Sequence, residues 1–430
     1  MNSNKQVLNY KPYTMKDAAI WFLTFLWLFS IIAFSKETIG FYIFVIVTGL
    51  VLMLSDFKLH IGSFHKYVTA FYVYCLLSVF WAWNYKYVLY RSTTILEIFI
   101  CMCVLYDYYL KLNNISILMK IIVWAGYAIM IYSFFYYGWN AMYAMALSGV
   151  RVSNDLANVN SICMFAATSV IIDVYLSLYG KARWSLLLAI PTVILISFMQ
   201  SRKALFMVLF APTLLYVYKN SDNLTKDIRP IMRIVLGFMV LGFVVVLFSD
   251  TSFFTGLASR MKSLYLGLTG SGETDASTQL RMEMINEGLK QFKQTPLLGI
   301  GIGNSLVLTT RNLGETAYLH NNYIELLACG GIIGFLLYYR IHFYLLRNLF
   351  RFRKRNPVAI LFILMIITTL FTDYGAVSYY SKTTYFYFML LFVFLENCRT
   401  EYPHSVISPA SSKLPKGKYN SKNTQQVTNI

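Results

Sequence analysis

Residues 18–34, AAIWFLTFLWLFSIIAF, form an uncharged apolar run that is long enough to cross a lipid bilayer as one helix. No small-residue cleavage site follows it, so we interpret this run as a first membrane span and not as a signal peptide. Eleven further apolar segments follow it along the chain: 39–54, 67–83, 93–109, 117–138, 156–178, 184–200, 204–218, 232–248, 322–345, 357–372 and 383–397. The pattern predicts an all-α polytopic membrane protein with about twelve transmembrane helices.

The composition favours the same class. Hydrophobic residues make up 57% of the 430 residues and charged residues 13%, and the mean hydropathy is +0.55. A soluble domain carries roughly 25% charged residues, so this chain lacks the polar residues that a soluble surface needs. The net charge of +18 would suggest nucleic-acid binding in a soluble protein, but here the basic residues lie mainly between apolar segments. We therefore expect a lipid bilayer, and no nucleic acid, among the partners.

The distribution of Lys and Arg predicts the orientation in the membrane. With a cytoplasmic N-terminus, the inside connections hold 24 of these residues and the outside ones 7, once the long loop 249–321 is set aside. Both termini are then cytoplasmic. We expect a bundle of about nine spans in 1–248, an external loop in 249–321, about three spans in 322–397, and a disordered cytoplasmic tail in 398–430.

The loop 249–321 is too polar to enter the bilayer. Within it, Ser277–Gln294 has the pattern of an amphipathic helix that ends before Pro296. Arg281 lies on the apolar stripe of this helix, so it must pair with an anion or reach water. A guanidinium suits bidentate contacts to phosphate, which favours an anion site over a structural ion pair. The helix is a candidate lid or wall of a site.

Two other stretches place polar residues at the ends of spans. Arg202, between Ser201 and Lys203, lies in a tight hairpin that would either attract an anion or anchor the chain at the membrane surface. Arg151 lies in a loop that leads to Asn160, where helix capping is the alternative to binding.

His320 is the strongest single candidate for a catalytic residue, because it lies where the external loop meets the tenth span. A histidine at that depth can be neutral near physiological pH and accept a proton from a hydroxyl, although interfacial histidines are more often structural. Asn321 and Glu325 are four residues apart on one helix face, so we expect Glu325 to enter the membrane paired with a partner.

Three other patterns are set aside. Residues 299–303, GIGIG, resemble a nucleotide loop but follow a helix and a proline, so no nucleotide site is expected. The six cysteines lie in or beside apolar segments, and neither disulfides nor a metal site is expected of them. Charged residues within or near spans are expected to be paired and structural: Glu97, Lys120 and Asp173.

The pair His320-Asn321, followed after nine residues by 331–334 (GIIG), resembles the signature of the O-antigen ligase and O-antigen polymerase superfamily. The resemblance covers roughly residues 150–345. The matching features upstream are the Arg151 to Asn160 segment, the Ser201-Arg202 hairpin, Arg281 in its amphipathic helix, and residues 296–301 (PLLGIG).

This resemblance implies a GT-C-like, metal-independent glycosyltransferase without a cofactor. It would use an undecaprenyl-diphosphate-linked glycan on the outer side of the cytoplasmic membrane. Arg202 and Arg281 would bind the diphosphate and stabilise the charge of the leaving group, and His320 would position or deprotonate the acceptor hydroxyl. The substrate-binding residues would be Arg151, Asn160, Arg260, Asn321 and Glu325.

Members of the superfamily differ in their acceptor. A polymerase joins the growing chain to another lipid-linked repeat unit, whereas a ligase transfers it to lipid A-core. Residues 320–339 are more similar to polymerases of surface polysaccharide such as O-antigen or capsule, so we favour a polymerase, with a chain-length regulator as a candidate partner. Residues 11–14 (KPYT) are similar to some ligases and keep that alternative open.

Two other classes remain. A flippase or transporter of lipid-linked oligosaccharide would suit twelve spans, but the second half of the chain does not duplicate the first. A cell-wall glycan polymerase of the shape-and-division type also has a large external loop, but its catalytic carboxylate has no obvious counterpart here.

Overall fold

The computed structural model describes residues 13–35, 38–148, 156–180, 184–220 and 276–401, and its regular elements in these ranges are all helices. They are α1 (Met15–Ala33), α2 (Thr38–Leu54), α3 (Ser63–Leu77), the short 3-10 helix η1 (Ser78–Phe80), α4 (Tyr85–Leu112), α5 (Ile115–Ser148), α6 (Val159–Tyr179), α7 (Leu186–Phe198), α8 (Arg202–Lys219), α12 (Ala276–Gln294), α13 (Ser305–Leu313), α14 (Asn322–Phe352), α15 (Val358–Asp373) and α16 (Lys382–Glu401).

Eleven of the twelve predicted apolar segments lie on these helices, and the twelfth, 232–248, lies outside the described residues. Within the described ranges, five helices are long and apolar enough to cross a membrane, namely α1, α4, α5, α6 and α14, and α2, α7 and α15 are shorter apolar helices. The chain is therefore an integral, helical membrane protein.

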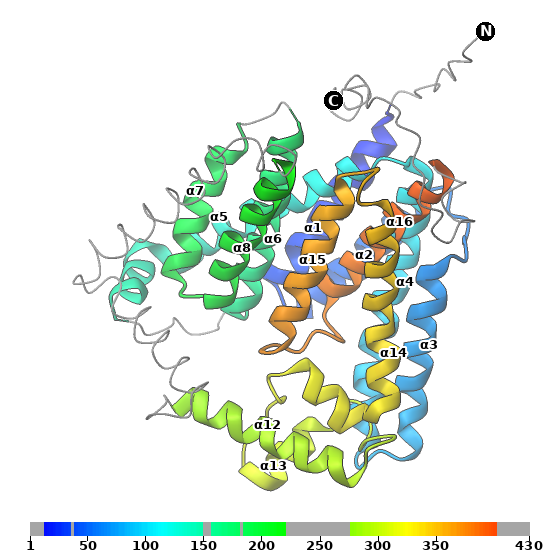
Figure 1. Cartoon of the computed structure of the whole chain (residues 1–430), viewed down its shortest axis with the longest axis vertical. Coiled ribbons are helices and arrows are strands. Elements are labelled where there is room, and N and C mark those ends of the chain that lie inside the picture. The colour runs from blue at the N-terminus through cyan, green and yellow to red at the C-terminus, as the bar shows by residue number, and fades with distance from the viewer. Residues whose placement is uncertain (1–12, 36–37, 149–155, 181–183, 221–275, 402–430) are drawn as a thin grey trace.

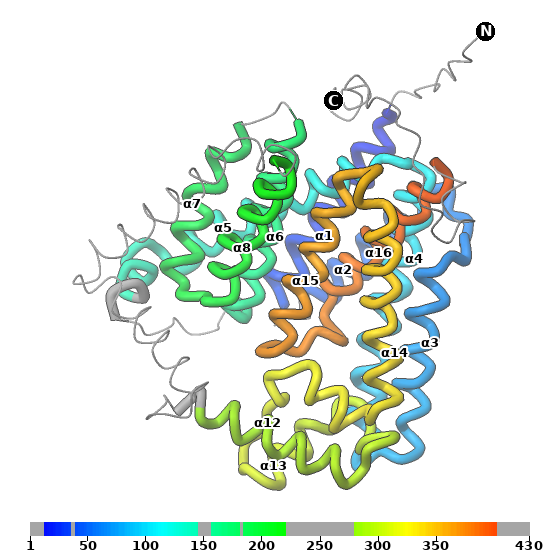
Figure 2. The backbone as a smooth tube through the Cα atoms, viewed as in Figure 1, coloured from blue at the N-terminus to red at the C-terminus, as the bar shows by residue number. Residues whose placement is uncertain are grey.

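The helices form two groups that α15 and α16 connect, since α15 contacts α14 on one side and α6 and α8 on the other. Helices α5, α6, α7 and α8 pack against one another, while α3, α4 and α14 form the second group (Figure 1). Helix α16 contacts α4, α14 and α5, and α1 contacts α2, α5 and α16. Helices α12 and α13 lie across one end of the second group, with α12 packed on α14 (Figure 2).

The helix predicted over Ser277–Gln294 is present as α12, which ends at Gln294 just before Pro296. A second helix, α13, was not predicted. The two helices share a small apolar core of their own with the following turn and the start of α14; its members are Met284, Ile300, Leu308, Leu319, Ala328 and Cys329. This core fixes the loop as a wall against the bundle.

The GIGIG turn serves packing. Gly299 and Gly301 have φ of +68° and +93°, a region that L side chains rarely adopt, and a Cβ at Gly299 would overlap the backbone of Cys329. The N–H of Ile300 donates to the Ala328 carbonyl at 3.1 Å, which ties the turn to α14.

Gly331 breaks α14. Its φ is +57°, and a Cβ there would overlap the carbonyl of Leu297. The N–H of Ile332 leaves the helical ladder and donates to the Pro296 carbonyl at 2.8 Å. The break therefore docks the segment after α12 onto α14, and beyond it the helix continues to Phe352, seven residues past the predicted end of the span.

Gly331→Ala is expected to destabilise the fold by about 2 kcal/mol or more, because the new Cβ adds both left-handed strain and overlap. The measurement is the thermal unfolding midpoint of the detergent-purified protein. Gly49→Ala in α2 is the control, since a Cβ there meets nothing within 4 Å. Equal midpoints for the two variants would mean that Gly331 does not set the break.

Helix α16 is longer than predicted. Helix α16 continues to Glu401, so residues 398–401 are helical and not part of a disordered tail. The reason is that Arg399 donates to Glu396 at 2.9 Å and to the Tyr344 hydroxyl of α14 at 2.5 Å, which stabilises one more turn. Residues 402–430 lie outside the described residues.

Asp173 is paired within the bundle as predicted. Its carboxylate accepts from the Tyr127 hydroxyl and from the Ser185 hydroxyl, each at 2.6 Å. These bonds join α6 to α5 and to the start of α7, so the charge serves structure.

Candidate functional site

The His320-Asn321 pair forms the sharp corner between the segment after α13 and helix α14. Asn321 is the N-cap of α14, and its side-chain oxygen accepts from the N–H groups of Tyr323 and Ile324 at 3.0 and 3.2 Å. His320, just before the cap, has φ of +54°, which is uncommon for a residue other than glycine. Such strain persists only where the surroundings hold the backbone, and it often marks a functional position.

Glu325 stabilises that corner through hydrogen bonds. Its side chain is buried, and the carboxylate accepts from the Ser305 hydroxyl at 2.5 Å and from the N–H of Leu319 at 2.8 Å. Glu325 is paired as predicted, but the partner expected from the sequence, Asn321, is wrong, because the Asn321 side-chain oxygen caps α14. Since Leu319 precedes His320, the carboxylate fixes the backbone that carries the imidazole.

Helix α12 brings Arg281 to the same corner. Gly288 of α12 packs so closely that a Cβ there would lie 2.5 Å from Ile324 and 2.7 Å from Leu319. Arg281 is half-buried, and its charge acts on both His320 and Tyr318, whose rings lie 4.2 Å apart. The structure thus brings two of the residues selected from the sequence, Arg281 and His320, together.

The hairpin between α7 and α8 reaches the site through Lys203. Its ammonium donates to the Gly375 carbonyl, and its charge acts on His320. Arg202 is the preceding residue, in the first turn of α8, and is half-buried. The buried Ser201 donates to the Asn160 side chain at 3.2 Å, so the predicted Asn160 lies beside this hairpin.

The environment keeps His320 uncharged. Burial lowers its pKa first, and the cations Arg281 and Lys203 lower it further, to about 4. At neutral pH the imidazole therefore has a free lone pair with two cations nearby. A neutral base beside cations suits a reaction in which a proton leaves one reactant while negative charge grows on another.

A polar network braces the corner against α15. The Asn322 side chain accepts from the N–H groups of Ser378 and Tyr379 at 2.9 and 3.1 Å, and it donates to Asp373 at 3.3 Å. Asp373 also accepts from the Tyr339 hydroxyl at 2.9 Å, and it interacts electrostatically with Lys203. The network fixes the connection between α15 and α16, whose Gly375 carbonyl accepts the hydrogen bond of Lys203.

Sequence reasoning missed two cations at this site. Lys203 was noted only as a neighbour of Arg202. Arg91 of α4 was not selected at all, yet its guanidinium lies 3.9 Å from the centre of the Tyr380 ring and its charge acts on the buried Glu325. In the sequence, Arg91 is distinguished only by its position at the edge of an apolar segment. Many membrane proteins have basic residues at such positions, so this position does not single out Arg91.

Two predicted substrate-binding residues, Arg151 and Arg260, lie outside the described residues. In the described part of the chain, no three His, Cys, Asp or Glu side chains gather closely enough to hold a metal ion. The six cysteines, all described, are free thiols.

A family model described as O-antigen ligase matches residues 156–339. This range starts just before Asn160, includes the α7–α8 hairpin, α12 and the His320 corner, and ends within α14. No curated protein matches the chain.

Proposed function

We propose that this chain, which belongs to the O-antigen ligase and polymerase superfamily through residues 156–339, is a polymerase that joins lipid-linked glycan repeat units. Donor and acceptor are both undecaprenyl-diphosphate-linked, and the His320 site faces the outer side of the cytoplasmic membrane. The observation that carries the proposal is a neutral imidazole held next to two cations, Arg281 and Lys203.

In the proposed reaction, His320 accepts the proton of the acceptor sugar hydroxyl. The hydroxyl oxygen forms a bond to the anomeric carbon of the donor, and the bond from that carbon to the diphosphate oxygen breaks. Undecaprenyl diphosphate departs with the bonding electrons, and Arg281, Lys203 and Arg202 stabilise its charge. These cations do the work that a metal does in other phosphate-leaving reactions, so the proposal needs no cofactor.

The acceptor is tested with the purified protein in lipid nanodiscs. Lipid-linked repeat units alone should be converted to longer lipid-linked chains. Transfer that occurs only after lipid A-core is added would make the protein a ligase, as the description of the matched family suggests. Movement of the lipid-linked glycan across a vesicle membrane without any new glycosidic bond would overturn both enzyme assignments.

The pH dependence of the transfer reaction is expected to follow His320. The pKa of its imidazole in the folded protein, about 4, lies below the ordinary value of 6.5. The base therefore stays neutral down to about pH 5, and the acidic limb of kcat/KM should have its midpoint near 4. The same shift costs stability as the pH falls from 6.5 toward 4, because the unfolded chain takes up the proton first. A limb centred at 6.5 in a protein that remains folded would contradict the assignment.

Glu325 is proposed to act through His320 rather than on the substrate. Glu325→Ala removes the acceptor of the Leu319 N–H and should lower kcat by roughly tenfold or more with little change in KM. Glu325→Gln keeps an oxygen for that N–H and an amide for the Ser305 hydroxyl, so it should retain most of the activity. Equal losses in the two variants would show that the negative charge matters and not the tether.

A further inference from the structure

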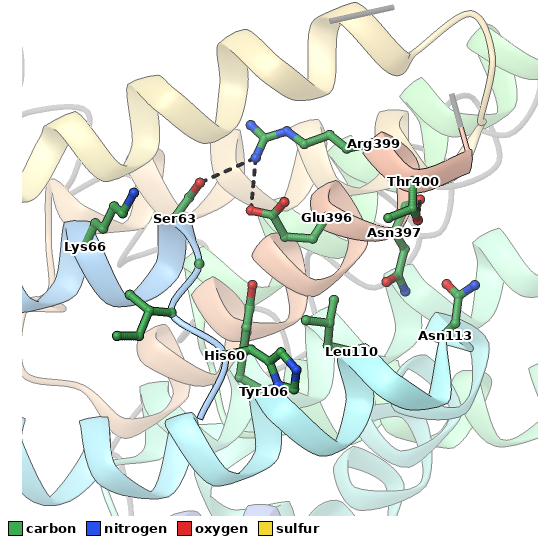
Figure 3. Close-up of a pocket in the computed structure, with 12 residues that line it drawn as sticks. His60, Ser63, Lys66, Tyr106, Leu110, Asn113, Glu396, Asn397, Arg399 and Thr400 are labelled. Carbon is green, nitrogen blue, oxygen red and sulfur yellow. Dashed lines mark hydrogen bonds and ion pairs between the residues drawn. The ribbon is translucent and has the colours of Figure 1, made fainter. Parts of the chain in front are cut away.

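A polar pocket lies at the end of the bundle away from the His320 corner. It has a volume of about 600 Å³ and is formed by the start of α3, the end of α4 and the end of α16 (Figure 3). The Tyr344 hydroxyl of α14 donates to Ser63 in its wall at 2.9 Å. Tyr344 lies 22 residues after Asn322, so α14 separates the pocket from the His320 corner by roughly 30 Å. That is the thickness of a bilayer core, and the two sites therefore face opposite leaflets.

The N-terminus of α3 opens into this pocket. The first N–H groups of a helix have no partner within the helix, and they carry the positive end of its dipole. The N-cap residue is Gly62, which supplies no side chain to cover them. Gly62 and Ser63 both line the pocket, so these donors are positioned for an anion.

A buried hydroxyl lies beside the same helix end. Tyr106 of α4 lines the pocket, is 1% exposed, and its hydroxyl has no hydrogen-bond partner among the described residues. A Cβ added to Gly62 would lie only 2.5 Å from that oxygen, which places the hydroxyl against the helix N-terminus. A buried hydroxyl without a partner costs free energy, and a ligand oxygen would satisfy it.

The charges of the lining favour an anion. Arg399 and Glu396 form an ion pair at 2.9 Å and neutralise each other. Lys66, which is exposed, has no acidic partner within 4 Å in the described part of the chain and leaves a net positive charge. Figure 3 shows Lys66, Tyr106 and Arg399 entering the pocket region from three different helices.

The rim is apolar. Ile61 lines the pocket and is 69% exposed, and Leu59 beside it is 56% exposed. An acyl chain would cover these side chains, whereas a soluble phosphate would leave them in water. We propose that this pocket binds the phosphate of an anionic phospholipid headgroup in the leaflet opposite the His320 site.

The test is native mass spectrometry of the full chain purified in detergent, with phosphatidylglycerol or phosphatidylcholine added. The wild type should retain phosphatidylglycerol in preference to phosphatidylcholine. Tyr106→Phe and Lys66→Gln should each weaken that retention by about tenfold, the expected loss for one hydrogen bond or charge contact to an anion. Lys86→Gln, an exposed lysine at the other end of α4, is the matched control and should behave as wild type.

Folding is checked separately by the thermal unfolding midpoint, which the exposed Lys66→Gln change should leave unaltered. Equal retention of phosphatidylglycerol by the wild type and both pocket variants would overturn the site. Equal retention of the two lipids by the wild type would overturn its selectivity for an anion. Displacement of the lipid by excess inorganic phosphate would overturn the lipid source and assign a soluble phosphate ligand instead.

Discussion

His320→Gly is expected to reduce glycan transfer by roughly 10²- to 10⁴-fold, the range that a general base contributes. Glycine is the sharper replacement because the backbone at this position has φ of +54°, which glycine adopts without strain. The variant therefore loses the imidazole while keeping, or gaining, stability. His320→Ala should be equally inactive but less stable, since alanine retains the left-handed strain.

Chemical rescue separates a proton acceptor from a structural residue. The cavity left by His320→Gly admits free imidazole, which should restore part of the transfer rate in a concentration-dependent manner. His320→Asn is the matched control, because asparagine tolerates left-handed backbone but cannot accept the proton, so it should show neither activity nor rescue. Transfer by the glycine variant at more than a tenth of the wild-type rate without imidazole would contradict the role of His320 as the base.

The fold was predictable wherever a segment carries its own signal. Helix α12 ends where Pro296 stops an amphipathic pattern, and the predicted span 117–138 ends at Gly138, where α5 has its non-helical break. Helix α13 was missed because it is only nine residues long and lies between a glycine turn and a second glycine, which together read as a loop. The turn 299–303 depends on contacts with α14 and with the segment before α4, which no local pattern predicts.

Site residues were predictable where a chemically suitable side chain lies in a recognisable motif. They were not predictable where contacts between distant segments determine which side chains meet. Arg281 and His320 were selected from the sequence, and in the structure the charge of Arg281 acts on the His320 imidazole. The partner of Glu325 is Ser305, twenty residues upstream on the helix that was missed. The hairpin has two adjacent cations, Arg202 and Lys203. That Lys203 acts on His320 follows only from the packing of α8 against the connection after α15.

Arg281→Ala is expected to lower kcat by roughly 10²- to 10³-fold, the loss typical of removing one group that stabilises a developing negative charge. The loss should appear mainly in kcat, because in the proposed reaction the charge on the leaving diphosphate increases in the transition state. Arg281→Lys should fall between alanine and the wild type, since an ammonium keeps the charge but cannot make two parallel hydrogen bonds.

The same substitution gives a second, independent result. The Arg281 guanidinium is one of the two cations that lower the pKa of His320, so Arg281→Ala should move the acidic limb of the pH profile upward, while Arg281→Lys leaves it nearly in place. Lys290→Ala on the same helix is the control: its side chain is 69% exposed and pairs with Glu287, so activity and pH profile should stay unchanged. An alanine variant with low activity and an unshifted limb would mean that Arg281 does not face His320 in the working enzyme. In that case its effect would arise from the packing of α12 alone.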